Sequence, residues 1–523
     1  MKLRKHSCRG GTSVLAVFFV ALFAVLSLSF AAMSNTNIQM SRNHRDAAEA
    51  QAAAESGLAY GDYLFSSYVT DVMPKTFYHT ISDGDAATIF NTLVTYVQSN
   101  LYASPIVGGT IISGSLDAGG ETGSTFLISG IKISNSIDAC FTLEFRRYDS
   151  NPLTIAMIST GNRFGISRKV GLSYTLIRDT RLLDFAVASR SRIIITGDST
   201  IDNDIYTAWD YPDFASPIEL AAGSTVNGDL NTTVGEADFP LEDVDGSYEN
   251  INYDQPDIVA DMGIVGFEAS DYNTSMYLAM TKSLLPSKSV GQVTEYFPHA
   301  PANYTLPADA SSNKIIRKVY EGATYTDRYL SAGNDTLFRN CVFEGVLYVG
   351  SGGGGMATNN VRFENCTFHG PIVTSVPNSF TSETWKKNVL YFTGNCTFNN
   401  TTDMQDLAIL APNFNVNIGN TKTLTEGEST LTGLIVGGVV DIRGNVEVNG
   451  TVVSMYNPSP EDGFRDATNI GYSGESSEAS FLPVPEGDAT GTILISPDPD
   501  RTIPAGMSTR ILIIRDSDSY LEY

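Results

Sequence analysis

The sequence predicts a mainly β protein with a long amino-terminal transmembrane α-helix, a small α/β region after it, and a right-handed parallel β-helix (solenoid) as the ectodomain. Three observations lead to this prediction. An apolar run begins at Thr12, alternating apolar and polar residues fill the middle of the chain, and a pattern of Phe, Asn and Cys recurs around Cys341, Cys366 and Cys396. The first pattern favours a membrane helix, the second β-strands and the third a solenoid.

The composition limits both the fold and the partners. A chain of 523 residues is too long for one ordinary core, so several domains or one long solenoid are expected. The formal net charge of −25, from 58 acidic and 33 basic residues, repels phosphate backbones, so nucleic-acid binding is not expected. Five cysteines without a CxxC pair, and five histidines, leave little material for a metal site, and no cofactor is expected.

The first segment, residues 1–10, is a basic leader whose charges favour the cytoplasmic side of a membrane. From Thr12 to Met33 the chain is apolar, which as a helix spans roughly 33 Å and crosses the hydrocarbon core. A cleaved secretory signal ending at Ser29-Phe30-Ala31 is the competing interpretation. A lipid anchor on Cys8 is disfavoured because this cysteine precedes the apolar run.

We expect one stem helix over residues 11–68, bent near Asn35 and Asn37, because helix formers dominate from Arg42 to about Phe65. One face of this stem carries residues at mostly three- and four-residue steps, namely Ala47, Ala50, Ala54 and Leu58. Small side chains allow another helix to approach closely. The stripe is therefore predicted to pack against other helices in an assembly.

The segment "RGGTSVLAVFFVAL" followed by "NIQMSRNHRDAAEAQAAAESGL" resembles the amino-terminal region of PilX-like minor type IV pilins and of K-type minor pseudopilins of type II secretion. The matching positions are Arg9-Gly10, Arg42-Asn43, Arg45-Asp46, Ala53-Ala54-Glu55 and Gly57-Leu58. The resemblance implies cleavage after Gly10 by a prepilin peptidase, with Gly11 as the first mature residue. Leu15 stands where major pilins carry a glutamate, which suggests a minor or tip subunit.

Residues 69–185 are expected to form a small pilin-like α/β region. A helix is predicted around residues 86–97, and "TFLISGIKIS", "CFTLEFRRY" and "PLTIAMISTGNRFGISRKVGLSYTLIRD" alternate as antiparallel strands do. Within the last of these, "STGNRFGISRKVGLSY" is typical of a β-hairpin and is similar to the strand pair that closes the sheet in the resembling families.

Three segments of the carboxyl half repeat one pattern: "FRNCVFEG" (338–345), "FENCTFHG" (363–370) and "FTGNCTFNN" (392–400). A second pair, starting at Ile201 and Val226, shares the 25-residue step between Cys341 and Cys366, and a segment at Val448 echoes it. Such periods indicate a solenoid over residues 186–460, with an insertion near 235–335. Residues 461–523 are expected to be an acidic Pro/Gly-rich loop and a final strand, either a cap or an added sheet edge.

The spacing of Phe and Cys in these repeats requires a corner where the alternation is reset, and asparagine tolerates the left-handed conformation of such a corner. Stacked coils then bring equivalent residues into ladders. The expected ladders are Asn340, Asn365 and Asn395, and Cys341, Cys366 and Cys396. The cysteines are interpreted as small core residues, with a disulfide between two of them as the alternative.

Two groups of charged residues are candidates for chemistry. Asp198, Asp202 and Asp204 are either calcium ligands or acidic turn residues at solenoid corners. Asp441 and Arg443 share one face of a strand, as the acid and base of a lyase would, but the sequence has many such pairs. The stretch "GSGGGG" lacks the Lys-Ser/Thr that completes a phosphate-binding loop.

The expected function is non-enzymatic: a membrane-anchored minor pilin or pseudopilin-like protein of a type IV pilus or type II secretion-like system, displaying a β-helix for assembly or adhesion. The expected location is the bacterial inner membrane, single-pass, with a periplasmic or extracellular ectodomain, and a surface filament once assembled. Expected partners are the membrane, other pilin-like subunits and, as candidate ligands, surface polysaccharide or a host or other substratum. The alternative is an exported polysaccharide-active β-helix enzyme, a lyase or glycosidase.

Overall fold

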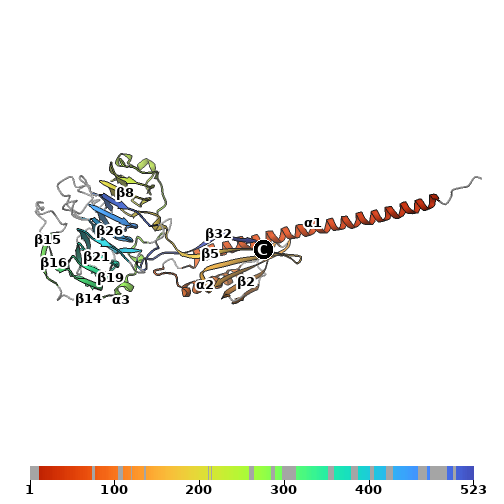
Figure 1. The fold of residues 1–523 in the computed structure, drawn as a ribbon, viewed down its shortest axis with the longest axis horizontal. Coiled ribbons are helices and arrows are strands. Elements are labelled where there is room, and N and C mark those ends of the chain that lie inside the picture. Colours follow the sequence, from red (N-terminus) through yellow and green to blue (C-terminus); the bar gives the residue numbers. More distant parts are fainter. Residues whose placement is uncertain are drawn as a thin grey trace, which may run out of the picture. The chain divides into compact units, whose positions relative to one another are not determined.

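A computed structural model describes residues 11–522, apart from 74–76, 104–109, 119–120, 135–136, 210, 214, 258–263, 265, 284–288, 297–313, 352–357, 378–386, 401–403, 405, 420–427, 457–467, 472–491 and 499–501. The chain divides into two compact units. The helix–sheet unit comprises Met1–Met73, Ile81–Ile177 and Leu512–Tyr523, and the solenoid unit comprises Pro74–Thr80 and Arg178–Ile511. Most of the solenoid unit is therefore inserted into the chain of the helix–sheet unit (Figure 1).

The helix–sheet unit contains a long helix, a shorter helix and an antiparallel sheet. Helix α1 spans Gly11–Asp71 without interruption, which confirms the long amino-terminal helix, and α2 spans Asp83–Ala103, where a helix was predicted. The sheet has the order β1-β2-β3-β4-β5-β32. Its strands are β1 (Thr110–Ala118), β2 (Glu121–Ser134), β3 (Ile137–Tyr148), β4 (Asn151–Arg163), β5 (Ile166–Arg178) and β32 (Ile511–Glu522).

Strands β4 and β5 form the predicted hairpin, in which Arg163 pairs with Ile166. The two turn residues, Phe164 and Gly165, have φ angles of 44° and 83°. Positive φ at both positions of a two-residue loop matches the twist of the flanking strands. The final strand, β32, lies at the sheet edge beside β5, so it is an added edge and not a cap of the solenoid.

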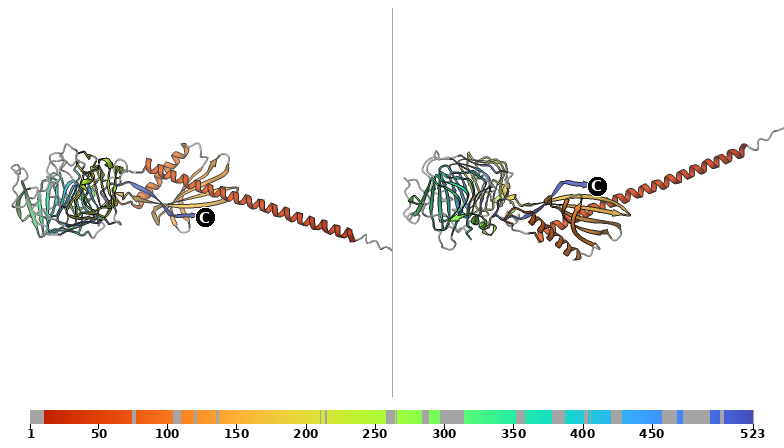
Figure 2. Two further views of the ribbon diagram at one scale, coloured as in Figure 1. Left: turned by 90° about the horizontal axis from the view of Figure 1, so that it is seen from above. Right: turned by 60° about the horizontal axis from the view of Figure 1, so that its bottom comes forward.

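One face of β3 and β4 is buried against α1. Alternate residues of these strands are inaccessible to solvent, among them Phe145 and Met157, as a strand with one covered face requires. Phe65 of α1 meets the Phe145 ring edge-on, with centroids 5.3 Å apart. Figure 2 shows the carboxyl half of α1 lying along this sheet and the amino half continuing beyond it.

The solenoid unit is a stack of coils in which parallel pairing sorts the strands into three columns, here called columns A, B and C. Within the described residues they belong to one continuous 26-stranded hydrogen-bonded sheet. The pairing confirms a mainly β protein with a parallel solenoid-like ectodomain, and the handedness of its coil stays a prediction.

Each coil passes through the three columns in the order A, B, C. Column A contains β16 (Lys314–Glu321), β18 (Thr336–Arg339), β20 (Asn360–Glu364), β23 (Val389–Thr393), the second halves of β25 (Leu407–Ile418) and β27 (Leu434–Ile442), β30 (Thr468–Ile470), β7 (Ile193–Ile195) and β10 (Ile218–Leu220). Strand β15 (Gly291–Tyr296) pairs antiparallel with β16.

Column B contains the first halves of β17 (Thr324–Leu330) and β19 (Val342–Val349), then β21 (Thr367–Phe368), β24 (Thr397–Phe398), β26 (Glu428–Thr432), β28 (Asn445–Asn449), β31 (Thr492–Ile495), β8 (Asp198–Ile201) and β11 (Thr225–Val226). Column C contains β14 (Lys282–Ser283), the second halves of β17 and β19, β22 (Ile372–Thr374), the first halves of β25 and β27, β29 (Val452–Ser454), β6 (Val187–Ser189), β9 (Ile205–Thr207), β12 (Leu230–Thr232) and β13 (Ile251–Asn252).

The chain enters this stack in its interior. The first coil, β6 to β8, pairs on one side with the last coil, β29 to β31, and on the other side with β9 to β11. From β13 the chain passes to the opposite end of the stack, where β14 to β17 begin the coils that return. The predicted insertion is thus the crossover between the two ends.

Two predicted boundaries need correction. Strands β16 and β17 already belong to the stack, although they lie inside the expected insertion. Strands β30 and β31 complete the last coil, although their segment was expected to be loop. Strands β30 and β31 have only three and four residues, which is too few for an alternating pattern to be recognised against the Pro- and Gly-rich connections around them.

Parts of the crossover and a later segment cover the outer face of column C. Tyr272, Tyr277 and Met507 belong to one buried apolar cluster with outward-facing residues such as Val436 and Val453. Tyr277 lies in the short helix α3 (Ser275–Met280). The repeat pattern is therefore absent from this part of the sequence because the chain here packs on the outside of the solenoid and does not form a coil.

Candidate functional site

The amino half of α1 is an uncovered apolar rod. Every residue from Ser13 to Arg45 is exposed. Within the described part of the chain, α1 is the one helix long and apolar enough to cross a membrane, and its most apolar 18-residue window is 0% buried. Large apolar side chains point outward all around it, among them Val14, Phe18, Leu22, Phe23, Leu26 and Phe30.

The predicted processing site lies at the start of this rod. Gly11 is the first residue of α1, whereas Gly10 lies outside the described residues. Cleavage after Gly10 would therefore leave a mature chain that begins with the helix.

The carboxyl half of α1 packs closely on its own sheet because three glycines remove side chains from the contact. A Cβ on Gly57 would overlap Ser159 Oγ and lie 2.8 Å from Phe141 Cδ2. A Cβ on Gly61 would overlap the Met157 sulfur, and one on Gly161 of β4 would overlap the helix backbone at Ala50. Glycine at these positions brings the helix axis close to the strands.

This packing corrects the predicted role of the small-residue stripe. Ala50, Ala54 and Leu58 are buried in the helix–sheet unit and Ala47 is partly buried, so the stripe faces the protein's own sheet. It is not free to receive another helix. Sequence reasoning missed Gly61, although Gly57 and Gly61 are one helical turn apart on the same face and carry that signal.

Polar contacts hold both ends of this helix–sheet contact. Arg163, in the β4–β5 hairpin, pairs with Asp46 at 3.1 Å and with Glu49. Farther along, Asp62 accepts a hydrogen bond from Tyr174 and pairs with Arg515 of β32 at 3.4 Å. Burial, and then the Asp62 carboxylate, raise the pKa of Tyr174, so its hydroxyl remains a donor.

The solenoid brings the predicted Phe, Asn and Cys repeats into register. Phe338, Phe363 and Phe392 pair in column A, and Phe343, Phe368 and Phe398 pair in column B. The Phe338 and Phe363 rings stack at 5.5 Å and the Phe368 and Phe398 rings at 4.3 Å, both nearly parallel. Ile201 and Val226 pair as well, and Val448 joins the same row through Ile495.

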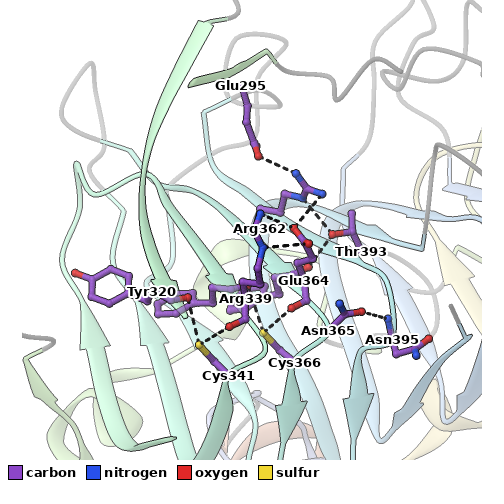
Figure 3. Close-up of polar contacts among 12 residues, drawn as sticks. Glu295, Tyr320, Arg339, Cys341, Arg362, Glu364, Asn365, Cys366, Thr393 and Asn395 are labelled. Carbon is purple, nitrogen blue, oxygen red and sulfur yellow. Dashed lines mark hydrogen bonds and ion pairs between the residues drawn. The ribbon is translucent and has the colours of Figure 1, made fainter. Parts of the chain in front are cut away.

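The corner between columns A and B is left-handed. Asn340 and Asn365 have φ angles of 50° and 53°, and in the next coil Gly394 takes this conformation at 68°. Asn395 is therefore one position past the corner. The Asn365 side-chain carbonyl accepts a hydrogen bond from the Asn395 N–H at 2.9 Å (Figure 3). The Asn395 side-chain carbonyl in turn accepts one from the Glu428 N–H at 2.8 Å.

The three cysteines are stacked, buried and free in the described structure. Each thiol donates to the carbonyl of the aromatic residue in the preceding coil: Cys341 to Tyr320 at 3.4 Å, Cys366 to Phe338 at 3.4 Å and Cys396 to Phe363 at 3.8 Å. Burial raises the pKa of Cys396 to about 11, so this thiol stays neutral and unreactive at neutral pH.

An ionic network lies on the outer face of column A near β15 (Figure 3). The Glu295 carboxylate pairs with Arg317 and Arg362, both at 2.7 Å. Glu364 pairs with Arg362 at 3.5 Å and with Arg339 at 3.2 Å. Sequence reasoning missed this network because its members come from four separate strands, and it neutralises the buried Arg317.

The acidic cluster is dispersed along the coils. Asp198 is exposed, Asp202 accepts hydrogen bonds from Asn227 and Ser496, both at 2.7 Å, and Asp204 accepts one from Asp229 N–H at 2.8 Å. Among the described residues no group of three or more His, Cys, Asp or Glu side chains is arranged to hold a metal ion. The bonds tie one coil to the next, as acidic corner residues would.

Asp441 and Arg443 form a buried ion pair with contacts of 2.8 and 3.1 Å. Both side chains are 4% exposed. A pair whose charges neutralise each other in this way has no available base, so the geometry gives no support to a lyase reaction at these residues.

Comparisons with known proteins give little further information. No family model and no curated protein matches the chain. Among solved structures, the crystal structure of the competence-associated pilin ComZ from Thermus thermophilus matches at 12% identity, covering 91% of this chain and 97% of that chain, with a TM-score of 0.24. A TM-score of this size carries no conclusion about the fold or function of this chain.

Proposed function

We propose that this protein is a non-enzymatic, single-pass minor pilin or pseudopilin-like subunit, anchored in the bacterial inner membrane by α1. The observation that carries this proposal is the division of one continuous helix. Its amino half exposes apolar side chains on every side, while its carboxyl half is buried on the sheet of the same unit. Such a rod is insoluble in water unless lipid or other helices surround it.

The filament step uses the same surface as the membrane step. An apolar helix without charged residues between Ser13 and Met40 exchanges lipid for neighbouring helices without exposing a charge to hydrocarbon. Arg42 and Arg45 then mark the point where the helix leaves the apolar environment. The glycine contacts of Gly57 and Gly61 keep the folded part of the subunit fixed to its stem.

The solenoid unit is suited to display because its chain enters and leaves at one place. The Asp179 N–H donates to the Arg510 carbonyl at 2.8 Å, so the two ends of the insertion are adjacent. Arg178 donates to the carbonyls of Met507 at 2.7 Å and Ile503 at 2.5 Å and to Thr509 Oγ1 at 2.9 Å. The solenoid is thus an inserted domain with a hydrogen-bonded base.

The test is the mature amino terminus. The full-length protein is expressed in a host that contains a prepilin peptidase, and the purified chain is analysed by intact-mass and peptide mass spectrometry. The proposal predicts a chain that begins at Gly11, and retention of the leader in Gly10→Val. Gly84→Val, in the exposed first turn of α2, serves as a matched control and should be processed normally. A chain that begins after Ala31 or Ala32 would contradict the proposal.

A further inference from the structure

The turn of the β4–β5 hairpin lies at the end of the helix–sheet unit that is nearest the exposed apolar half of α1. Arg163 in this hairpin contacts Asp46 at 3.1 Å, and a Cβ on Gly161 would overlap the Ala50 carbonyl oxygen. The exposed rod from Ser13 to Met40 is roughly 42 Å long, which matches a bilayer together with its headgroup layers. Asp46 lies about 9 Å farther along the helix axis. The hairpin is therefore next to the headgroup surface of a membrane that α1 spans.

Unpaired cationic side chains gather at this end of the unit. They are exposed and have no ion-pair partner among the described residues: Arg42 of α1, Lys132 of β2, and Arg168 and Lys169 of β5. Lys132 lies in one row of paired residues with Cys140 and Asn162, two positions before the hairpin turn. Arg42 lies about one helical turn before Asp46 on α1. The cations thus come from three strands and the helix, and they meet around the hairpin.

The acidic side chains near the hairpin leave a local excess of positive charge. Asp46 and Glu49 are paired with arginines. Asp138 of β3 and Glu522, at the end of the strand beside β5, are exposed, but they are fewer than the unpaired cations. In a chain with a formal net charge of −25, such an excess is a local feature that attracts anionic groups.

Phe164 is an unexpected residue at the tip of the hairpin. Its φ angle of 44° lies in the left-handed region, which favours glycine and asparagine. The side chain is 66% exposed, although the Arg163 guanidinium lies 4.9 Å from the centre of its ring. A large aromatic side chain therefore occupies a strained position that the protein itself does not bury. Aromatic rings beside cationic residues are stabilised at the boundary between headgroups and acyl chains.

We propose that the hairpin end, here called the cationic tip (Arg42, Lys132, Phe164, Arg168 and Lys169), binds anionic phospholipid headgroups at the membrane surface from which α1 emerges. The arginines and lysines contact phosphodiester groups, and Phe164 enters the headgroup layer. Each cation near an anionic surface adds to the attraction, and salt screens it. Lipid is favoured over an acidic protein surface because the tip is continuous with the apolar rod.

This inference rests on the proposed function, because α1 has to span the membrane for the cationic tip to reach headgroups. It adds a second lipid contact to the anchor. The folded part of the subunit is then held at the membrane surface before assembly, and the subunit leaves two lipid contacts when it enters a filament.

The test is photo-crosslinking of the full-length protein in lipid nanodiscs. A benzoylphenylalanine replaces Phe164, and mass spectrometry measures the fraction of the chain that is joined to lipid. Discs of equal parts phosphatidylcholine and phosphatidylglycerol should give about fivefold more lipid adduct than discs of phosphatidylcholine alone. Added salt should reduce this difference, because it screens the cations from the headgroups.

A charge reversal within the cationic tip is compared with the same change elsewhere. Lys169→Glu, in the chain that carries the crosslinker, should lower the adduct in anionic discs by about fivefold. Lys282→Glu is the matched control, since Lys282 is an exposed lysine in strand β14 of the solenoid unit, and it should leave the adduct unchanged.

Phe164→Asn separates lipid binding from a structural role. Asparagine suits the left-handed turn, so the Tm of the free protein in detergent should stay the same or rise. In wild-type discs, anionic lipid should protect the hairpin amides from hydrogen exchange, and Phe164→Asn should weaken this protection. A lower Tm with unchanged protection would overturn the membrane role of Phe164.

The proposal is overturned if position 164 gives no lipid adduct in anionic discs, or if Lys169→Glu and Lys282→Glu behave alike. Equal adducts in both kinds of disc would overturn the role of the cations. Crosslinks from position 164 to another subunit in cells, without a lipid adduct in discs, would assign the tip to a subunit interface instead.

A crosslinker at Phe18 in the same discs reports the membrane span of α1 independently. Lipid adducts from position 18 without adducts from position 164 would contradict this inference alone. Their absence from both positions would contradict the anchoring role as well.

Discussion

The internal contacts of the helix–sheet unit differ in kind from those of the solenoid unit. In the first, each contact occurs once: Gly57 has one position against Ser159, and Arg163 has one pair of acids on α1. In the second, each contact is repeated by the next coil, as the Phe338, Phe363 and Phe392 stack shows. The comparison teaches that the stem depends on a few close approaches, whereas the displayed domain depends on the continuity of rows.

An interruption of the stacked phenylalanine rows should lower stability more than any other substitution considered below. Phe363 is fully buried and stacks on Phe338 and Phe392, and it meets Phe343 and Phe368 edge-on. Phe363→Ala should lower the free energy of opening of the solenoid unit by about 4 kcal/mol. Hydrogen exchange followed by mass spectrometry reports the two units separately.

The effect of Phe363→Ala should stay within the solenoid peptides, with unchanged protection in β3 and β4. Phe363→Leu, which keeps most of the volume, is the matched variant and should cost about 1 kcal/mol. Equal loss of protection in both units would break the proposed separation of their cores.

The close approach of α1 predicts the next largest effect. Gly57→Val places side-chain atoms on Ser159 and Phe141 and should lower the stability of the helix–sheet unit by about 3 kcal/mol. Gly84→Ala is the control, because a Cβ there meets only Ser82 Oγ at 3.7 Å, and it should change stability by less than about 1 kcal/mol. Hydrogen exchange of the β3 and β4 peptides measures both. If Gly57→Val left the protection of these peptides unchanged, the helix would be able to shift on its sheet.

The corner ladder predicts a smaller cost in the solenoid. Asn365→Ala forces a non-glycine, non-asparagine residue to φ near 53° and removes the bond from Asn395 N–H, at a cost of about 2 kcal/mol. Asn365→Gly relieves the backbone but not the lost bond, and should cost about 1 kcal/mol. Denaturant unfolding followed by near-ultraviolet spectra measures the difference. If the two variants were equal, the left-handed corner would not be the reason for asparagine.

The smallest expected effect is an alkaline one in the helix–sheet unit. Burial and Asp62 raise the pKa of Tyr174 above its usual value of 10.0. Its contribution to stability is complete below pH 10 and is lost as the pH rises further, because the unfolded chain releases this proton first. Tyr174→Phe should therefore show a shallower loss of stability between about pH 10 and 11 than the wild type. Identical slopes would mean that the hydroxyl does not remain protonated.

Much of the architecture is readable from the sequence. The apolar run predicts the exposed half of α1, and the Phe and Cys spacing predicts which residues pair between coils, as Phe363 with Phe392 shows. The repeats can be recognised in the sequence because equivalent strands place the same residue types in the core of the solenoid. The hairpin at Phe164 and Gly165 can be predicted because the residues that form its turn are adjacent in the sequence.

Other features were hidden because they depend on contacts between distant residues. Nothing local shows that β6 pairs with β29, so the sequence does not predict the entry of the chain into the middle of the stack. The sequence predicts helix partners for the small-residue stripe because its actual partner, the face of β3 and β4, exists only once the sheet has formed. Tyr391, Asn417, Asp441 and Asn469 pair in successive coils, but unequal connections separate them in the sequence, which conceals their common face.

The measurement that tests the central claim most directly is photo-crosslinking from the two halves of α1 in cells that assemble the filament. A photoreactive residue is placed at Phe18, in the exposed apolar half, or at Tyr63, which is exposed in the half that lies on the sheet. The account predicts that position 18 crosslinks to lipid before assembly and to the helices of other pilin-like subunits after it. Position 63 should give neither lipid nor helix-core products. Lipid crosslinks from position 63, or the absence of residues 11–31 from the mature chain, would contradict it.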